Sequence, residues 1–288
     1  MKCLLFGQVI KPEDEPFVNE IVKELESLNF DISIYQDIVG SINPKTSWPV
    51  LSMTNFFAGQ VDLIISLGGD GTMLKAATLS GSTGIPLLGI NLGRLGFLAT
   101  TDKTQAKKVL QDIKKGQYSV EARTALKLKN AEHLFGNNTF ALNDFTILKR
   151  DNSSMIKITA SINNEFFNTY WADGLIVSTP TGSTGYSLSC GGPIVLPQAN
   201  NFIITPVAPH NLTARPTVIP DNSELTFEVE GRSENFLCTL DSRFATINSD
   251  QRLVLCKNDF AINLIKPHKE SFLKTLRGKL NWGRDIRN

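Results

Sequence analysis

The chain has 288 residues, of which 41% are hydrophobic and 20% are charged, as is typical of a globular protein large enough to bury a core without disulfides. It carries 29 Lys and Arg residues against 28 Asp and Glu residues, and this balance gives no sign of a surface that binds nucleic acid or membrane. No apolar stretch has the length of a membrane span, and the apolar run at 3–6 is too short for a signal peptide. We therefore expect a cytoplasmic protein with no nucleic-acid or membrane partner.

The first hundred residues alternate between strand and helix patterns. Strands are expected at 2–10, 32–35, 61–67 and 85–91, and helices at 12–28, from the glycine-rich run at 68–72 to 79, and from 101 or 102 to 115. The segment 40–54 contains two prolines and is expected to be a loop. Such alternation predicts a parallel sheet with helices on both faces.

After residue 116 the pattern changes to strands that favour antiparallel sheets. They are expected at 118–129, 140–149, 155–167, 224–230, 236–240, 252–255 and 261–265, followed by a last helix at 269–280. Asn163 and Asn164 interrupt one of these runs, which is typical of a hairpin turn.

The first motif with chemical content is the run Gly68, Gly69, Asp70, Gly71 and Thr72, between a predicted strand and a predicted helix. Glycines allow a phosphate close to the backbone, and a helix N-terminus favours its charge. An aspartate would repel a phosphate, but it can accept a proton from a hydroxyl or bind Mg²⁺. The alternative is a tight turn in which Asp70 only caps the helix.

The second motif is the glycine- and hydroxyl-rich run from 178 to 193, which follows a strand-like segment. Its small residues can surround a polar ligand with hydrogen bonds, and Tyr186 can stack on a flat ring. A surface loop rich in turn formers is the alternative, but a loop of this length without a function is uncommon in a compact domain.

Three shorter features are ambiguous on their own. The side chains of Asn143 and Asp144 can together hydrogen-bond the two hydroxyls of a ribose, or the pair can form an ordinary turn. Asp173, before the second motif, has the same two interpretations. His210 lies in a proline-rich connection and is expected to be structural, because no nucleophile accompanies it. The four cysteines contain no C-x-x-C pair and the three histidines are scattered, so we expect no metal site built by the protein.

Taken together, these runs resemble the NAD kinase family. GGDGT at 68–72 is shared with diacylglycerol and sphingosine kinases, but DGLIVSTPTGSTGYSLSCGGPIV at 173–195 is close to the signature that distinguishes NAD kinases. Further matches are NLGRLGFL at 91–98, PHNLTARP at 209–216 and LRGKLNWG at 276–283, so that the resemblance covers most of the chain.

The resemblance implies a fold and an oligomer. The fold is α/β plus β, with a Rossmann-like nucleotide-binding domain at 1–101 and 267–288 and a β-rich, sandwich-like NAD-binding domain at 102–266. Family members are commonly homodimers or homotetramers, in which a neighbouring subunit completes the NAD site.

The resemblance also implies roles for individual residues. Asp70 matches the group that accepts the proton of the ribose 2′-hydroxyl, and Gly68, Gly69, Gly71 and Thr72 form the phosphate-binding loop. The matched NAD-binding positions are Asp70, Gly71, Lys75, Phe97, Asn143, Asp144, Asp173, Thr184, Gly185, Tyr186, Ser187, Leu188, Ser189 and Ala208.

Four positions depart from the family pattern. Asp144 stands where the family usually has Glu, and Gly185 replaces a usual Ala. Trp171 occupies a position where bacterial members often have Arg, and Arg243 ends a run that aligns with Asp-Gly-Gln. These changes bear on substrate specificity and leave the Gly-Gly-Asp-Gly core intact.

The expected reaction is Mg²⁺-dependent transfer of the ATP γ-phosphoryl group to the adenosine ribose of NAD, which we expect to lie in the cleft between the two domains. One alternative is a kinase for a lipid or another small molecule, which would need a broad apolar acceptor pocket. Another is a sensor that binds NAD without catalysis, which the presence of Asp70 disfavours.

Overall fold

The computed structural model describes residues 1–42, 45, 47–150, 155–268 and 271–282. The chain divides into two compact units, one formed by Met1–Ala122 with Ile262–Asn288 and the other by Arg123–Ala261. Among the described residues, no helix is long and apolar enough to cross a membrane.

The first unit is built on a seven-stranded sheet in the order β3-β2-β1-β4-β5-β19-β6. Its strands are β1 (Lys2–Phe6), β2 (Asp31–Tyr35), β3 (Val50–Leu51), β4 (Leu63–Leu67), β5 (Leu87–Ile90), β6 (Tyr118–Arg123) and β19 (Ile262–Pro267). The pairs from β3 to β19 are parallel, as the alternation of strands and helices predicted. The short β3 lies within the segment that we expected to be a loop.

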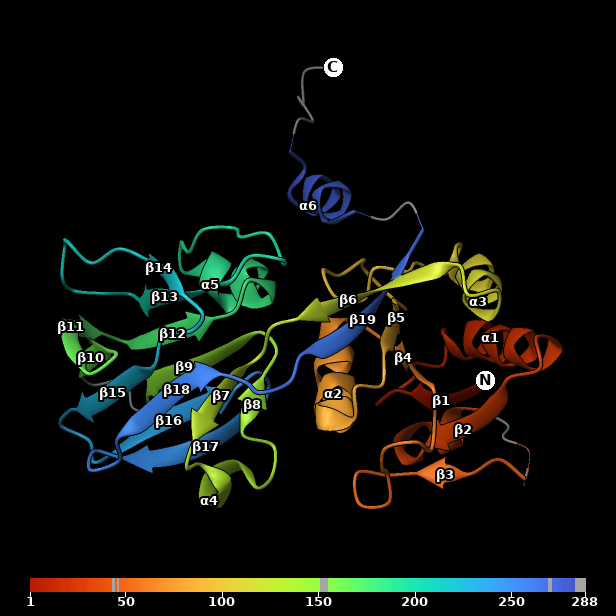
Figure 1. Cartoon of the computed structure of the whole chain (residues 1–288), viewed down its shortest axis with the longest axis horizontal. Helices are drawn as coiled ribbons and strands as arrows, with labels where there is room; N and C mark the ends of the chain where they lie inside the picture. Colours follow the sequence, from red (N-terminus) through yellow and green to blue (C-terminus); the bar gives the residue numbers. More distant parts are fainter. Residues whose placement is uncertain (43–44, 46, 151–154, 269–270, 283–288) are drawn as a thin grey trace. The chain divides into compact units, whose positions relative to one another are not determined.

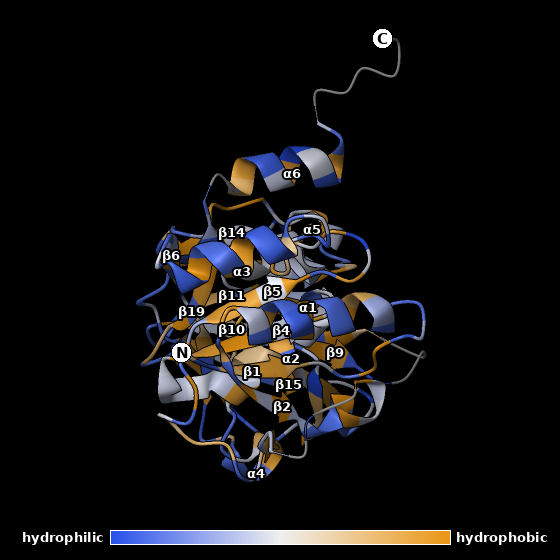
Figure 2. Cartoon of the chain, turned by 90° about the vertical axis from the view of Figure 1, so that its right-hand side faces the viewer, coloured by the Kyte–Doolittle hydropathy of each residue, from blue (hydrophilic) through white to orange (hydrophobic). Residues whose placement is uncertain are grey.

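Helices lie on both faces of this sheet (Figure 1). They are α1 (Glu15–Ser27), α2 (Asp70–Ser80) and α3 (Ala106–Lys114). The unit also contains α6 (Phe272–Leu280) and the 3-10 turns η1 (Gln36–Ser41) and η2 (Gly81–Thr83). Ile21 of α1 and Leu110 of α3 share a buried core with Leu5 and Ile65 of the sheet. The strands are mostly hydrophobic, whereas the helices alternate between hydrophobic and hydrophilic residues, as a surface helix must (Figure 2).

Three helix predictions in this unit differ from the structure at their starts. The helix expected at 12–28 begins at Glu15, after a turn in which the Asp14 amide donates to the Lys11 carbonyl. The helix expected from 101 or 102 begins at Ala106, because Asp102 accepts hydrogen bonds from the Thr104 and Gln105 amides and forms a separate turn. Residues 269 and 270, expected in the last helix, lie outside the described residues, and α6 begins at Phe272 after the N-cap Ser271.

The second unit contains two six-stranded antiparallel sheets, in the orders β11-β10-β15-β18-β7-β8 and β14-β13-β12-β9-β16-β17. The strands are β7 (Leu126–Lys129), β8 (Phe140–Ala141), β9 (Asp144–Lys149), β10 (Ile156–Ile162), β11 (Glu165–Ala172), β12 (Gly174–Ser178), β13 (Asn201–Val207), β14 (Thr217–Pro220), β15 (Leu225–Glu230), β16 (Asn235–Leu240), β17 (Arg243–Asn248) and β18 (Leu253–Lys257). Short helical segments α4 (Glu132–Phe135), η3 (Thr181–Thr184) and α5 (Tyr186–Ser189) connect them. Side chains from both sheets form one core that includes Phe145, Phe227 and Phe236.

The hairpin prediction is confirmed, because Asn163 and Asn164 have φ values of 51° and 66° between β10 and β11. Two expected strands are each divided in two. The run 118–129 becomes β6 and β7, which belong to different sheets, and 140–149 becomes β8 and β9, which also belong to different sheets. The second division falls at Leu142 and Asn143, beside the candidate site.

Candidate functional site

The glycine-rich run lies where β4 ends and α2 begins, as predicted. Gly68 has a φ of 154°, and a Cβ there would lie 2.3 Å from Oγ1 of Thr72, so this turn requires glycine. Asp70 is the first residue of α2, and its carboxylate accepts hydrogen bonds from the amides of residues 97–99 and from no amide of α2. The alternative in which Asp70 only caps the helix is therefore wrong.

The Asp70 carboxylate is instead held by another loop of the same unit. Oδ2 accepts a hydrogen bond from the amide of Phe97 at 2.8 Å, and Oδ1 accepts from Leu98 at 3.0 Å and from Ala99 at 2.9 Å. A Cβ on Gly96 would lie 1.8 Å from Oδ1, so only glycine fits there. We call Asp70 with the amides of residues 97–99 the Asp70 clamp.

The loop that forms this clamp is fixed at both ends by Asn91. Its Oδ1 accepts from the Gly93 amide at 2.8 Å, and its backbone amide donates to the Thr101 carbonyl at 2.8 Å. Thr101 in turn donates to Gly89, so that residue 101 forms a bridge to β5. The run matched at 91–98 is thus a folded loop with its amides turned toward Asp70.

The other matched residues of the first unit lie around this clamp. Gly71 and Lys75 are exposed on α2, and Thr72 is partly buried. The half-buried ring of Phe97 lies 6.2 Å from the ring of Phe272 and 5.7 Å from the Nζ atom of Lys279, both on α6.

In the second unit, Asn143 lies between β8 and β9, Asp144 is the first residue of β9, and Asp241 holds their backbone. Its carboxylate accepts from the amides of Leu142 at 2.9 Å, Asn143 at 2.8 Å and Asp144 at 3.2 Å. We call this arrangement the Asp241 clamp. It explains why the expected strand 140–149 is divided here.

Arg243 supports the chain just before this segment, at residues 138–140. Its guanidinium donates to the carbonyls of Asn138 and Phe140 and lies 5.6 Å from the ring of Phe140. In this chain Arg243 therefore stabilises the backbone of the loop.

The Asp144 side chain is buried, and two effects raise its pKa to about 7. Burial has the larger effect, because it disfavours the charged form, and the negative charge of Asp241 adds to it. Asp144 therefore titrates near neutral pH. The neighbouring Oδ1 of Asn143 is buried and has no hydrogen-bond partner among the described residues, as expected of an acceptor that awaits a ligand hydroxyl.

The second motif is a pair of short helical segments, η3 and α5, and is more ordered than the loop we expected. Its hydroxyls form local hydrogen bonds that hold this shape: Thr179 donates to Leu142 at 2.6 Å, and Ser183 donates to Pro180 at 2.7 Å. The amide of Thr179 also donates to the carbonyl of Asn143. The motif is thereby attached to the segment that carries Asn143 and Asp144.

Gly185 brings the motif against these two side chains. A Cβ there would lie 3.6 Å from Nδ2 of Asn143 and 3.7 Å from Oδ2 of Asp144. Tyr186 is 40% exposed, and its pKa is raised first by partial burial, then by Cys190 and by Asp144. Asn143, Asp144, Gly185 and Tyr186 therefore form one group.

The remaining matched residues divide between this group and its surroundings. Ser187 is buried and hydrogen-bonds Thr205 at 2.8 Å, so it supports the motif from inside. Ser189 is exposed, and Thr184 and Leu188 are partly buried.

Asp173 and Ala208 lie together at the ends of β12 and β13. The amide of Asp173 donates to Val207, and its carboxylate forms an ion pair with Lys149 at 2.7 Å. Ala208 has a φ of 44°. The 48% exposed side chain of Trp171 lines a different cavity of about 340 Å³, together with Lys157 and Arg232.

Comparison with known proteins decides the family. Residues 17–118 match the model of the ATP-NAD kinase N-terminal domain, and residues 142–267 match that of the C-terminal domain. The chain is 46% identical to the NAD kinase of Cytophaga hutchinsonii over 99% of both chains, and 45% identical to that of Flavobacterium psychrophilum over 100% of both. The chain belongs to the NAD kinase family.

Two solved structures show that the fold is also that of an NAD kinase. The crystal structure of yeast NADH kinase complexed with NADH has a TM-score of 0.87 at 23% identity, and covers 100% of this chain and 89% of that one. An NAD kinase from Archaeoglobus fulgidus in complex with ATP has a TM-score of 0.77 at 23% identity, with 98% of this chain and 99% of that one covered.

Sequence reasoning missed the groups that hold the NAD kinase motifs in place: Gly96, Asp241 and the Arg243 backbone contacts. A signal existed for Gly96, since it lies inside the matched run 91–98. Asp241 also carried a signal, because it lies in the run that aligns with Asp-Gly-Gln of the family, but only Arg243 of that run was singled out.

Proposed function

We propose that this chain transfers the γ-phosphoryl group of ATP to the 2′-hydroxyl of the adenosine ribose of NAD, giving NADP. The observation that carries the proposal is that a chain similar to NAD kinases over its full length keeps Asp70 in a fixed position at the end of a parallel strand. In open α/β sheets, such strand ends are where ligands bind.

In this proposal the second unit binds NAD. The free Oδ1 of Asn143 and the carboxylate of Asp144 accept hydrogen bonds from ribose hydroxyls, and Tyr186 provides an aromatic face. Thr184, Ser187, Leu188 and Ser189 shape the motif around the nucleoside, and Asp173 and Ala208 lie at its edge.

The first unit performs the transfer. Asp70 accepts the proton of the 2′-hydroxyl as that oxygen attacks the γ-phosphorus, and ADP leaves with the electron pair of the broken bond. Gly68, Gly69, Gly71 and Thr72 allow the phosphates close to the backbone, while Lys75 and Phe97 contact NAD.

Mg²⁺ enters this proposal with the nucleotide. Within the part of the chain that the structure describes, no group of three His, Cys, Asp or Glu side chains could hold a metal ion, and Asp70 is engaged by three amides. This fits a cation held mainly by ATP phosphates and water, which Mg²⁺ tolerates well. It would neutralise phosphate charge during transfer.

We further propose that the protein is cytoplasmic and a homodimer or homotetramer. The edge strand β11 has exposed Phe166 and Trp171 side chains, and edge strands of this kind favour association. Light scattering of the purified protein tests this, and a strict monomer at micromolar concentration would contradict it.

The reaction is tested by incubating the purified chain with ATP, Mg²⁺ and NAD, and reading NADP with an NADP-specific dehydrogenase. NADP should form with ATP and NAD together and not with either alone. A diacylglycerol arm tests the lipid kinase alternative. A folded protein that binds NAD by calorimetry yet forms no NADP would contradict the proposal and favour the sensor.

A further inference from the structure

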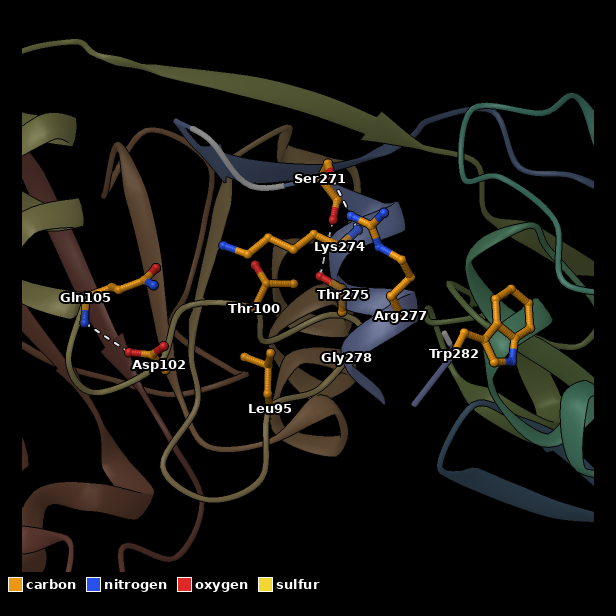
Figure 3. A pocket seen from close by; sticks show the side chains of 10 residues that line it. All are labelled: Leu95, Thr100, Asp102, Gln105, Ser271, Lys274, Thr275, Arg277, Gly278 and Trp282. Atoms are coloured by element: carbon orange, nitrogen blue, oxygen red, sulfur yellow. Dashed lines mark hydrogen bonds between the residues drawn. The ribbon is translucent and has the colours of Figure 1, made fainter. Parts of the chain in front are cut away.

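The helix α6 lies beside the loop of residues 91–101, which holds Asp70. A cavity of about 520 Å³ lies between the two, and Figure 3 shows Thr275 and Gly278 of α6 opposite Thr100 and Leu95 of the loop. The walls of a cavity lack the contacts of a packed interface, so this face of α6 is only weakly attached to the loop. The attachment therefore depends on contacts outside the cavity.

A second face of α6 contacts the loop through the ring of Phe97. Phe272, Leu276 and Lys279 have the spacing i, i+4 and i+7, which places them in one stripe along the helix. Leu276 is buried in this stripe. The ring centroids of Phe272 and Phe97 are 6.2 Å apart, and the Nζ atom of Lys279 lies 5.7 Å from the Phe97 centroid. Two turns of α6 therefore act on one half-buried ring.

The geometry of these two contacts suits the orientation of a ring. The rings of Phe272 and Phe97 are tilted by 42°, within the range of distances and angles that favours aromatic pairs. Lys279 lies within the distance at which a cation is attracted to the face of a ring. The two contacts come from positions two turns apart on α6, so together they restrict the ring more than either does alone.

Lys279 also differs from the other lysines that lie over aromatic rings in this unit. Lys103 forms an ion pair, and Lys114 donates to a backbone carbonyl, so each has a second partner besides its ring. Lys279 has no second partner in the part of the chain that the structure describes. Its contact with Phe97 is therefore the interaction that places its charge.

Phe97 connects α6 to the proposed chemistry. Its amide donates to Oδ2 of Asp70 at 2.8 Å, while the amides of Leu98 and Ala99 donate to Oδ1. Its ring is one of the groups that we expect to contact NAD. Because Oδ1 keeps two donors of its own, loss of the α6 contacts should free the ring more than the carboxylate.

We propose that α6 positions the Phe97 ring for NAD, with Phe272 as the main positioning residue and Lys279 as the second. The inference rests on the proposed function, because Phe97 is the NAD contact through which α6 acts. A ring that is held in place before NAD arrives loses less conformational freedom on binding, which strengthens binding without a new contact. In this account α6 sets the affinity for NAD, and Asp70 sets the rate of transfer.

The test is steady-state kinetics of the whole protein with NAD varied at saturating MgATP, together with calorimetric binding of NAD. Phe272→Ala should raise the KM and the Kd for NAD by about three- to tenfold, as expected for the loss of an aromatic pair. The kcat and the KM for ATP should stay within about twofold of wild type. Phe272→Tyr, which keeps the ring, should retain the wild-type KM for NAD.

Lys279→Ala should raise the KM for NAD by about two- to fivefold, because a cation near an exposed ring contributes less than a ring pair. Leu273→Ala is the matched control for Phe272→Ala, since Leu273 is an exposed apolar residue of α6 outside the stripe. It should behave like wild type, and thermal unfolding should show that all variants are folded. A Phe272→Ala protein that is less stable but has an unchanged KM for NAD would overturn the proposal.

A double variant shows whether Phe272 acts through Phe97. Phe97→Ala alone should raise the KM for NAD, and adding Phe272→Ala to it should raise that KM little further, because the two rings act together. Fully additive losses would mean that Phe272 affects NAD by another route, and would overturn the proposal.

The same measurements separate this inference from the proposed function. A wild-type protein that forms no NADP, but whose Phe272→Ala variant binds NAD more weakly, would refute the function and keep the role of α6. A wild-type protein that forms NADP, with an unchanged KM for NAD in the Phe272→Ala, Lys279→Ala double variant, would keep the function and refute the role of α6.

Discussion

The two units use the same arrangement of a carboxylate and three consecutive amides in opposite ways. In the Asp70 clamp, the backbone of residues 97–99 holds the carboxylate that we propose accepts a proton. In the Asp241 clamp, the carboxylate holds the backbone that carries Asn143 and Asp144. In our proposal the side chain performs the chemistry in the Asp70 clamp, whereas in the Asp241 clamp it only supports the backbone.

The difference predicts how each clamp responds to substitution. The Asp70 clamp depends on the close approach of the Gly96 backbone to the Asp70 carboxylate, so one methyl group added at Gly96 should disrupt it. The second depends on a side chain, so its removal should loosen the NAD-binding segment and leave the catalytic group intact.

The largest effect is expected from Gly96→Ala. The new Cβ would lie 1.8 Å from Oδ1 of Asp70 and would displace the carboxylate. We expect kcat to fall by about a hundredfold or more, similar to the loss of a general base. Gly93→Ala, whose Cβ meets no atom within 4 Å, should leave kcat nearly unchanged.

A double variant shows whether Gly96 acts through Asp70. Adding Gly96→Ala to Asp70→Asn should cost little more activity than Asp70→Asn alone, because residues that act together are not additive. Additive losses would mean that the Asp70 clamp is a general packing feature.

The next effect is expected from Asp241→Ala. Three amides would lose their acceptor and Arg243 a nearby negative charge, so the segment with Asn143 and Asp144 should become mobile. We expect the KM for NAD to rise by about tenfold or more and the affinity for ATP to stay constant. Steady-state kinetics with each substrate varied would measure this, with the exposed Ser242→Ala as control.

A smaller effect concerns pH and stability. Burial raises the pKa of Asp144 to about 7 in the folded protein, whereas an Asp in an unfolded chain has a pKa of about 4. Between these two pH values the folded state keeps a proton that the unfolded state releases. The stability that this group contributes is full below pH about 4 and falls as pH rises to about 7.

Asp144→Asn should therefore raise the free energy of unfolding at pH 8 by about 1–4 kcal/mol, from 1.36 kcal/mol per pKa unit, while weakening NAD binding. Denaturant unfolding at pH 5 and pH 8 measures this, with Asp37→Asn, an exposed position, as control. Equal effects of Asp144→Asn at both pH values would show that the carboxyl does not titrate in this range.

The smallest effect is expected from Gly185→Ala. The added Cβ would lie 3.2 Å from the Gly182 carbonyl and farther from the Asn143 and Asp144 side chains, so a shift of a few tenths of an ångström suffices. We expect a change in the NAD KM of less than about threefold. Gly182→Ala is the severe counterpart, since its Cβ would lie 2.0 Å from the Asn143 carbonyl oxygen.

The sequence predicted the fold well where hydrophobic periodicity is regular. The parallel strands of the first unit and the hairpin at Asn163 and Asn164 follow from local patterns, and the structure contains both. The divided strands at 118–129 and 140–149 could not be predicted in this way, because both halves of each run keep a strand pattern when the chain passes from one sheet to another.

The candidate site was predictable where residues carry a motif and hidden where they act at a distance. The position of Asp70 follows from the strand and helix around it. Its partners at 97–99 and the link from Asp241 to Asn143 join residues far apart in the chain, which a single sequence does not reveal.

The central claim is that Asp70 accepts the proton of the NAD hydroxyl during phosphoryl transfer. Single-turnover formation of NADP at saturating MgATP and NAD tests it directly, with Asp70→Asn compared to wild type and to Asp37→Asn, and with NAD affinity measured for each protein. The account predicts that Asp70→Asn binds NAD normally and forms NADP at least about a hundredfold more slowly. Near-normal NADP formation by Asp70→Asn would contradict it.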